Sequence, residues 1–331
     1  MASLRVQAVV AAAASVSEAI TSHLVVERGM VGPFRLAYGF HRGSSIWIGR
    51  AREFRALLRQ IGADLRHLLL AAVPAERLFR LRSLDPDRFQ WEAVTTWPEA
   101  VEAIRGKPVE MAVVDPLLGG SVPRTHGIGR LRQFFPSLPL LVYTELAPAT
   151  AGVLLELGRA GIRRVVVHRY EDAPGSLRGA LLAELEQSAS QQVIQGLVPT
   201  LRELPRELQL ALESMLHAPG EAPTVTALAD RARLTRRTCE RWFTKVGLPS
   251  PRVVMVLTRL LYAHRLLLDP GYTVEDVALK LGYSKTKTLQ MHLRAVFGLT
   301  AGELRVSLST DDALATVTAR YFTPVRRAAA S

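Results

Sequence analysis

The sequence predicts an α/β region with a parallel sheet, followed by an all-α region in which one helical motif occurs twice. In residues 63–192, short apolar runs alternate with segments of helical periodicity. In residues 205–306, helical patterns surround a break of Pro, Gly, Glu and Ala at residues 219–223. The chain has 331 residues, 48% of them hydrophobic, which suffices for two domains with cores of their own.

The charge balance points to a polyanionic partner. The formal net charge of +12 attracts nucleic acid or an anionic membrane surface. The single cysteine, Cys239, excludes an internal disulfide framework and is typical of a reducing cytoplasm. No run approaches 18 uninterrupted apolar residues, so we expect a cytoplasmic protein without a membrane partner.

Residues 1–62 read as an extension ahead of the first domain. The Ala-rich stretch 4–14 resembles a signal peptide in composition, but we expect an amphipathic or frayed helix there. Residues 34–50 predict a hairpin around residues 41–44, and a basic helix is expected over residues 51–61. No chemistry can be assigned to this extension.

The α/β region should contain five strands and five helices. Strands are expected at residues 65–74, 89–94, 109–114, 138–143 and 164–167. Helices are expected at residues 75–81, 98–104, 128–135, 149–160 and 172–186. Because the strands are apolar and separated by helices, we expect a parallel sheet that is covered on both faces.

Sites in such sheets lie beyond the carboxyl ends of the strands, which here carry Ala71, Ala72, Asp115, Thr144 and His168. This order resembles the flavodoxin-like receiver domain of two-component response regulators. In that family an Asp after the third strand accepts a phosphoryl group, and a Thr or Ser follows the fourth strand. The resemblance implies that Asp115 is the candidate phospho-acceptor, with Thr144 beside it.

Two parts of the receiver pattern are missing. Ala71, Ala72 and Val73 stand where the family carries an acidic pair, and His168 stands where it carries a Lys. Without carboxylates a magnesium ion lacks oxygen ligands, and nothing neutralises a transferring phosphoryl group. We therefore expect a non-phosphorylated pseudo-receiver at residues 63–192. Phosphorylation of Asp115 is kept as the alternative.

Residues 193–204 are expected to be a linker, and residues 205–217 a helix. Further on, residues 273–305 predict two short helices around a tight turn. Val274, Val277, Ala278 and Leu281 follow helical spacing, and Gly282 suits the turn. We expect Thr273 to cap the first of these helices, with Asp276 in a capping box, and Ser284 to cap the second.

The same pattern occurs earlier, in residues 224–250. A helix at residues 225–232 is followed by a turn and by a second helix that Thr235 should cap. Between Arg231 and Lys245, six residues are basic and only Glu240 is acidic. A short helix, a turn and a polar, basic second helix are typical of the helix-turn-helix, which places its second helix in the DNA major groove. An ordinary helical hairpin with a solvated face is the alternative.

An apolar segment with spaced basic residues joins the two motifs at residues 251–269. As a helix it would span about 28 Å. It could therefore hold two recognition helices near the roughly 34 Å that separates successive major-groove faces. One chain would then read two adjacent grooves.

At this spacing, residues 205–306 resemble the DNA-binding domain of the AraC/XylS family of bacterial transcription regulators. The matching residues are Leu228, Ala229, Thr235, Arg236, Arg237, Thr238, Arg241, Phe243, Gly247, Arg259, Leu260, Ala263, Leu266, Leu267, Val277, Ala278, Leu281, Gly282, Tyr283, Ser284, Phe297, Gly298 and Arg305. The resemblance implies base or phosphate contacts from both recognition helices. The candidate DNA-binding residues are Arg236, Arg237, Glu240 and Arg241, then Ser284, Lys285, Thr286, Lys287, Gln290 and Arg294.

The second motif departs from the family at several positions. Met291 replaces a frequent Arg, Leu289 and Leu293 replace aromatic residues, Ala301 replaces a Pro, and Leu304 replaces a Tyr. The leucines can still form a core, but Met291 removes a DNA contact. We therefore expect the second motif to hold phosphates more than it reads bases.

The leading hypothesis is a sequence-specific transcription regulator of double-stranded DNA, with RNA polymerase and a homodimer through the receiver-like domain as expected partners. A small-molecule sensor or an interaction protein with a residual DNA-binding domain is the further alternative. DNA-repair methyltransferases with such modules need exposed reactive cysteines, whereas Cys239 is at an inward helical position. Zinc-ligand spacing, a P-loop and a GxSxG elbow are absent from the sequence, so we expect no enzyme, no cofactor and no metal. Residues 307–331 are expected to be a flexible tail.

Overall fold

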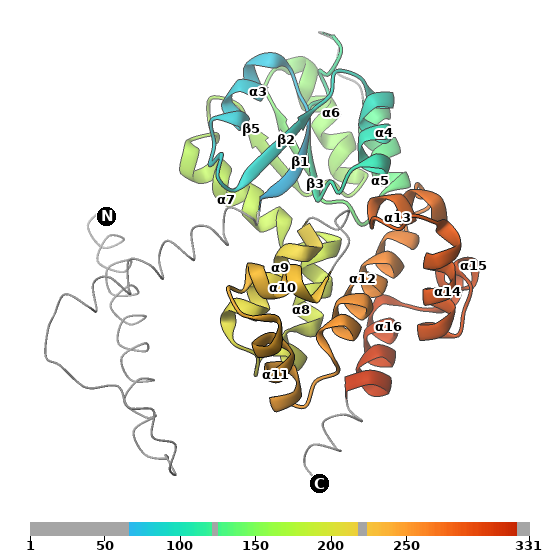
Figure 1. The fold of residues 1–331 in the computed structure, drawn as a ribbon. Helices are drawn as coiled ribbons and strands as arrows, with labels where there is room; N and C mark the ends of the chain where they lie inside the picture. Colours follow the sequence, from blue (N-terminus) through green and yellow to red (C-terminus); the bar gives the residue numbers. More distant parts are fainter. Residues whose placement is uncertain (1–65, 121–124, 218–223, 323–331) are drawn as a thin grey trace, which may run out of the picture. The chain divides into compact units, whose positions relative to one another are not determined.

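The structure is a computed structural model that describes residues 66–120, 125–217 and 224–322 (Figure 1). The described residues belong to one compact unit. The hairpin and helix predicted within residues 1–62 lie outside the described residues. Among the residues described, no helix has both the length and the apolar character that crossing a membrane demands.

The α/β half contains a five-stranded parallel sheet in the order β2-β1-β3-β4-β5 (Figure 1). The strands are β1 (His67–Ala72), β2 (Phe89–Ala93), β3 (Met111–Val114), β4 (Leu140–Thr144) and β5 (Arg164–Val167). Every neighbouring pair is parallel, and β1 pairs with both β2 and β3. This is the flavodoxin-like order with the switch point between β1 and β3, as the sequence predicts.

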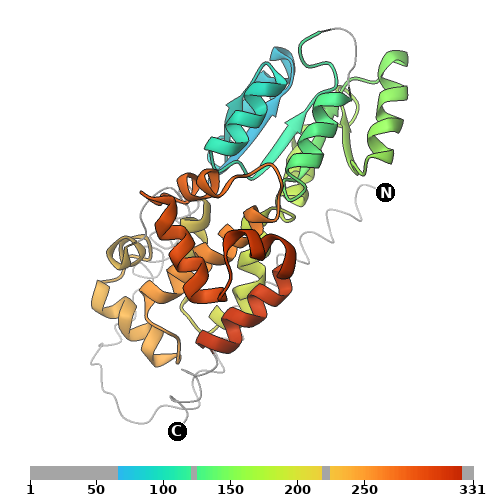
Figure 2. The same cartoon turned by 90° about the vertical axis from the view of Figure 1, so that its right-hand side faces the viewer.

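Helices cover both faces of this sheet (Figure 2). They are α3 (Ala75–Arg82), α4 (Trp97–Gly106), α5 (His126–Phe134), α6 (Pro148–Arg159) and α7 (Pro174–Leu185). Apolar residues of α4, α5 and α6 share one core with the sheet, and those of α3 and α7 share the other. The strands β3 and β4 are buried throughout because side chains on both of their faces are covered.

The helical half contains the two predicted helix-turn-helix modules. Its elements are α8 (Ala189–Leu201), α9 (Arg206–His217), α10 (Val225–Arg231), α11 (Arg236–Lys245), α12 (Pro251–Leu267), α13 (Val274–Lys280), α14 (Thr286–Phe297), α15 (Ala301–Ser307), α16 (Thr310–Val317) and a π-helical turn (Thr318–Phe322). The first module is α10 with α11, and the second is α13 with α14. Between them, α12 is the central helix, and most of its residues are buried.

Two segments differ from the expectations. The predicted linker at residues 193–204 is instead mostly the second part of α8, because Val193 and Leu197, one turn apart, are both buried. Gln192 on the same helix accepts a hydrogen bond of 3.0 Å from Arg265 Nε on α12. The predicted flexible tail is also ordered as far as residue 322.

That tail folds because it carries a helical apolar stripe. Ala313, Val317 and Phe322 are at most 1% exposed and belong to the core that contains α12. Ser309 caps α16 and accepts a hydrogen bond from Asp312 N. Residues 323–331 lie outside the described residues.

Several contacts join α/β residues to the segment that follows α12. Ser137 N donates to Asp269 Oδ1 at 3.0 Å, and Gly271 N donates to the carbonyl of Phe134 at 2.8 Å. A side chain at residue 271 would meet Phe135 Cε1 at 2.5 Å, so only glycine fits this approach. Lys280 Nζ on α13 donates to the carbonyl of Ile104 on α4 at 2.7 Å. The start of the second module is therefore packed directly against α4 and α5.

Candidate nucleic-acid interface

The turn of the first module depends on one residue in the left-handed conformation. Arg233 has a φ of +52°, and the next residue, Leu234, donates its N–H to the carbonyl of Ala229 at 2.8 Å. Thr235 then caps α11, accepting a hydrogen bond of 3.1 Å from Thr238 N, as predicted. The α11 helix thus begins after the four residues that separate it from α10, with its first turn capped by Thr235.

The predicted contact residues of α11 lie on its outer side. Arg236, Arg237 and Arg241 are exposed, whereas Cys239 and Phe243 on the opposite side are completely buried. Glu240 is half-buried, and its Oε1 accepts a hydrogen bond of 2.9 Å from Arg236 Nε. Two arginines therefore remain beside a Glu–Arg pair on one solvent-facing surface.

The second module repeats the turn with one extra residue. Gly282 has a φ of +67°, equivalent to Arg233, and Tyr283 N donates to the carbonyl of Ala278 at 2.9 Å. The prediction that Ser284 caps α14 is wrong, because Lys285 occupies the N-cap position and its side chain makes no capping hydrogen bond. Because of the extra residue in the second turn, the equivalent inward residues Cys239 and Leu289 lie 50 positions apart in the sequence, whereas the turn residues Arg233 and Gly282 lie 49 apart. The capping box of Thr273 and Asp276 forms as predicted.

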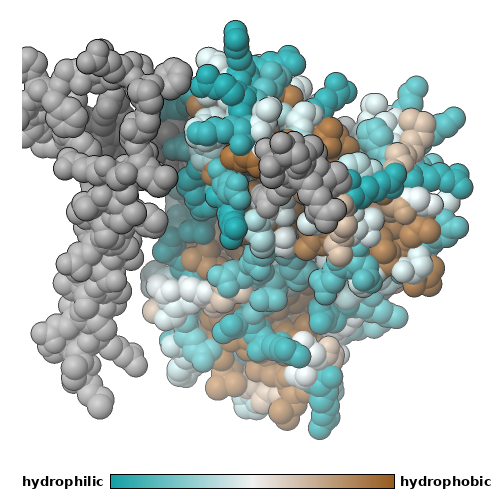
Figure 3. All heavy atoms as spheres, turned by 90° about the horizontal axis from the view of Figure 1, so that it is seen from below, coloured by the Kyte–Doolittle hydropathy of each residue, from teal (hydrophilic) through white to brown (hydrophobic). Residues whose placement is uncertain are grey.

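The outer side of α14 carries the other predicted residues. Ser284, Lys285, Lys287, Gln290 and Arg294 are exposed, and Thr286 is half-buried. On the inner side, Leu289 and Leu293 are completely buried, so the leucines maintain the core as predicted. Met291 is 56% exposed and places an apolar side chain on the outer surface. Figure 3 shows a face of the molecule on which hydrophilic side chains surround hydrophobic patches.

The helix α12 connects the two modules. It has 17 residues, or about 26 Å of helix. Arg259 on α12 fixes the second turn, because its guanidinium donates to the carbonyl of Leu281 and lies 4.7 Å from the ring centroid of Tyr283. The position of α14 therefore depends on a cation–π contact and a hydrogen bond to α12.

A separate group of residues lies at the carboxyl ends of the strands. Asp115 is completely buried, and its Oδ1 accepts hydrogen bonds from Thr144 Oγ1 at 2.9 Å and from Leu117 N at 2.8 Å. The guanidinium of Arg77 on α3 forms an ion pair with Oδ2. Burial raises the pKa of Asp115 although these partners favour its charged form. Asp115 and Thr144 meet as predicted, with a cation that the sequence reading missed.

His168, at the end of β5, forms a neighbouring network. It is 3% exposed, and its Nδ1 lies 2.8 Å from Asp172 Oδ2, which also accepts a hydrogen bond of 2.6 Å from Tyr143 Oη. Arg80 on α3 completes this network through an ion pair of 2.9 Å with Asp172. His168 thus pairs with the acidic side chains of Asp172 and Glu76 at the position where the receiver family carries a Lys.

Arg77 is a residue of this group that sequence patterns hardly indicate. Its only signal is its place one turn into the helix that follows β1, beside the missing acidic pair. Such an arginine would normally be assigned to the solvent. The structure makes it 4% exposed, because α3 packs its side chain over the end of β3.

Comparisons with known proteins found one matching family model and several similar solved structures. Residues 228–307 match the family model described as a helix-turn-helix domain. An AraC-type transcriptional regulator from Chromobacterium violaceum is 23% identical over 35% of this chain and 99% of that chain, with a TM-score of 0.28. No curated protein matches the chain.

Two further solved structures are similar over longer parts of the chain. FixJ from B. japonicum is 14% identical over 70% of this chain and 98% of that chain, with a TM-score of 0.28. RcsB from Salmonella enterica serovar Typhimurium, bound to promoter rprA, is 19% identical over 57% and 96%, with a TM-score of 0.31. Residues 228–307 thus form a helix-turn-helix domain.

Proposed function

We propose that the chain is a sequence-specific transcription regulator that inserts α11 and α14 into two adjacent major grooves of double-stranded DNA. The observation that supports it most is the matching construction of the two helices. Each follows a turn with one left-handed residue, buries an apolar side and exposes a basic side. Since α12 joins them on one chain, a single copy can address both grooves.

In this proposal α11 and α14 make different kinds of contact with DNA. Arg236, Arg237 and Arg241 on α11 supply guanidinium groups, which can form paired hydrogen bonds with guanine. On α14, Lys285, Lys287 and Arg294 supply positive charge, while Met291 takes a central outward position. The first module would therefore discriminate bases, and the second would mainly hold the phosphate backbone.

The test is a mobility-shift titration at fixed salt with DNA selected by the full chain from genomic fragments. Arg241→Ala should lower specific affinity by about 1–3 kcal/mol, because a bidentate base contact is lost. Arg88→Ala is the matched control, since Arg88 is exposed in the α/β half and its loss removes the same charge. Equal affinities of the two variants would refute the assignment of α11 as a reader.

We further propose that the α/β half is a pseudo-receiver that works without phosphorylation. Asp115 is completely buried and paired with Arg77, and Ala71, Ala72 and Val73 provide no oxygen ligands from their side chains. Incubation with acetyl phosphate and Mg²⁺ should leave no acid-labile phosphate on the protein. A labelled band that disappears in Asp115→Asn would establish the phosphorylated alternative instead.

Expected partners besides DNA are RNA polymerase and a second copy of the chain. The α/β half exposes large apolar side chains near its last strands, among them Leu155 at 67% and Tyr170 at 80%. Pairing through this region would bury them. Sedimentation velocity should show a dimer for the natural chain and a monomer for Leu155→Glu; monomers in both cases would exclude this pairing.

A polar cavity supports small-molecule sensing as a second candidate function. It has a volume of about 310 Å³ and is lined by Arg132, Arg163 and Arg265 among other residues. Three guanidinium groups favour an acidic ligand. A thermal-shift screen of small carboxylates and phosphates tests this function, with Arg163→Gln as the variant that should lose any response. A screen without a response would remove the candidate.

A further inference from the structure

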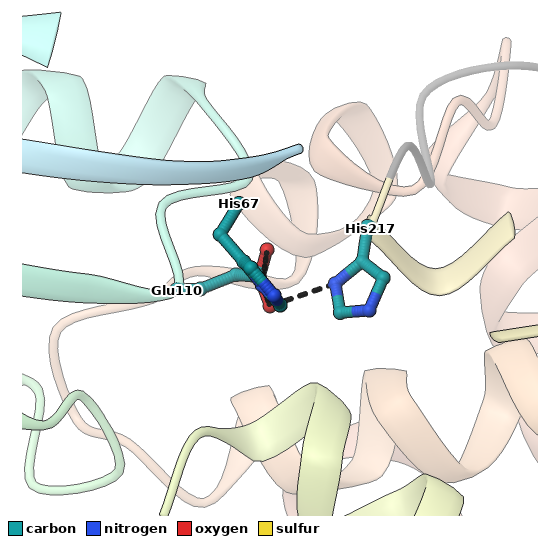
Figure 4. Close-up of side chains that lie close together, drawn as sticks. All are labelled: His67, Glu110 and His217. Atoms are coloured by element: carbon teal, nitrogen blue, oxygen red, sulfur yellow. Dashed lines mark hydrogen bonds and ion pairs between the residues drawn. The ribbon is translucent and has the colours of Figure 1, made fainter. Parts of the chain in front are cut away.

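Two histidines and one glutamate that are far apart in sequence meet in the interior (Figure 4). His67 begins β1, Glu110 directly precedes β3, and His217 is the last residue of α9. They are 6%, 3% and 4% exposed, respectively. Figure 4 shows the His217 ring directed at the carboxylate of Glu110, and the ring of His67 lies beside both, with its centroid 4.6 Å from that of His217. Buried ionisable groups are costly unless they have a specific partner, so this convergence requires an explanation.

The contacts within the cluster are short. His67 Nδ1 lies 3.2 Å from Glu110 Oε1 and 3.3 Å from Oε2, and His217 Nδ1 lies 2.8 Å from Oε2. Ser190 Oγ on α8 donates a further hydrogen bond of 2.8 Å to Oε2. Glu213, which lies one turn before His217 on α9, provides a second carboxylate beside the same imidazole. Both rings thus turn the same nitrogen, Nδ1, toward one carboxylate.

This geometry is close to that of a metal site. The three ligand atoms all lie within 4.8 Å of one another. With bonds of about 2.0–2.2 Å, the ligand atoms of a tetrahedral Zn²⁺ site are about 3.4 Å apart. The distances from His67 to Glu110 are already near this value, whereas His217 would have to move away from Glu110 by about 0.6 Å, and the two imidazole nitrogens would also have to reach this spacing.

The chemistry of the donors also selects a class of ion. Imidazole nitrogen suits zinc, copper, iron and nickel, whereas calcium and magnesium prefer sites made of oxygen. Two imidazoles and one carboxylate form a mixed set that favours a transition ion. Three protein ligands leave a fourth coordination position, which a water molecule would occupy.

We propose that His67, Glu110 and His217 bind one divalent transition ion of the zinc class. The ion would join two separate parts of the fold, because His67 and Glu110 belong to the amino-terminal edge of the sheet and His217 ends α9. The helix α9 packs beside α10, the first helix of the DNA-binding modules. Binding would thus fasten the sheet to the start of the helical half and stabilise the folded chain.

The alternative is a metal-free ion pair in which a protonated His217 faces Glu110. The two possibilities are separated by metal titration of the full chain, purified without a polyhistidine tag and stripped with a chelator. Zn²⁺ is titrated against a chromophoric competitor, and Co²⁺ binding is followed by absorption. We expect one ion per chain and intense visible bands of four-coordinate Co²⁺ with nitrogen ligands.

Substitutions test whether His67 and Glu110 are ligands of the ion. His67→Asn and Glu110→Gln should each weaken Zn²⁺ binding by more than about 100-fold, since loss of an outer-shell partner alone costs 10–100-fold. His126→Gln is the control, because it also removes one imidazole, but from an exposed position. The melting temperature should rise with Zn²⁺ in the natural chain and in the control, and stay constant in the two cluster variants.

Three outcomes would overturn the proposal. They are the absence of a stoichiometric ion in the natural chain, a Co²⁺ spectrum of an all-oxygen octahedral site, or equal Zn²⁺ affinity in His67→Asn and His126→Gln. The first two are measured on the natural chain and do not depend on whether a variant folds. Each also leaves the DNA-binding proposal untouched, because the mobility-shift test can be made on the stripped chain.

Discussion

The guanidinium of Arg77 forms an ion pair with the buried carboxylate of Asp115 at the carboxyl end of the sheet. Arg77 is 4% exposed and Asp115 is 0% exposed, so water reaches neither group easily. The arginine comes from α3, the helix that follows β1, where the sequence lacks an acidic pair. The guanidinium of Arg77 thus neutralises the carboxylate of Asp115. We therefore assign Asp115 a structural role as a buried, ion-paired residue.

Replacing Arg77 tests this role. Arg77→Met leaves a buried, unpaired carboxylate and should destabilise the chain by about 3–5 kcal/mol in urea unfolding. The double variant Arg77→Met with Asp115→Leu removes both charges and should recover most of that loss. A single variant as stable as the natural chain would show that Asp115 does not need its partner.

The buried amine of Lys280 should give stability a specific pH dependence. Burial lowers its pKa to about 7, although Asp269 and Asp276 oppose this shift. Between this value and the ordinary pKa near 10.4, the unfolded chain binds more protons than the folded chain, so the contribution of Lys280 to stability rises with pH.

The measurement is a comparison with Lys280→Met, in which this group is absent. From pH 7 to 9, the unfolding free energy of the natural chain should rise relative to that of the variant, with a slope of up to about 1.4 kcal/mol per pH unit. The difference in unfolding free energy between the two proteins isolates Lys280, because all other titrating groups contribute equally to both if their environment is unchanged. A difference that stays constant over this range would mean that Lys280 is not buried as the structure places it.

The thiol of Cys239 should be inert in the folded chain. Burial, together with the charge of the adjacent Glu240, raises its pKa to about 11. Since the thiolate is the reactive form, labelling with a disulfide reagent at pH 8 should be at least about 100-fold slower than in denaturant. Cys239→Ser provides the blank. Rapid labelling of the native protein would contradict the inward position of this residue.

Lys287 on α14 should contribute to affinity without contributing to specificity. Its exposed amine is proposed to contact a phosphate, so Lys287→Ala should weaken binding to the selected site and to unrelated DNA by the same factor. The slope of log K against log salt should become about one unit less steep. The Arg241→Ala variant should behave differently, losing affinity mainly for the selected site. A loss confined to the selected site in Lys287→Ala would make α14 a reader of bases.

Much of the fold could be predicted because it depends on local patterns. The conformations of the apolar strands and of Gly282 can be predicted from a few neighbouring residues. The structure confirms the parallel sheet and both modules. The linker and tail predictions failed because apolar residues are sparse in these segments. Residues such as Val193 and Val317 stand among polar neighbours in the sequence, so they form no clear apolar pattern. Their burial depends on α12, which lies far away in the sequence.

The site was predicted unevenly for the same reason. Arg237 and Lys287 stand out because exposed basic residues repeat on one side of a helix. Arg77 and the cluster of His67, Glu110 and His217 have no common spacing, since only the crossing of distant segments brings them together. Met291 shows the limit of pattern reading, because its exposure is known only once the inner side of α14 is fixed.

The central claim is that one chain reads two adjacent major grooves. The most direct measurement is selection of genomic fragments by the full chain, followed by hydroxyl-radical footprinting of the strongest site. We predict two protected half-sites about one helical turn, or 10–10.5 base pairs, apart on the same face of the duplex, with Arg241→Ala weakening the protection of one of them. A single protected half-site, or fragments without a shared sequence, would contradict the paired use of α11 and α14.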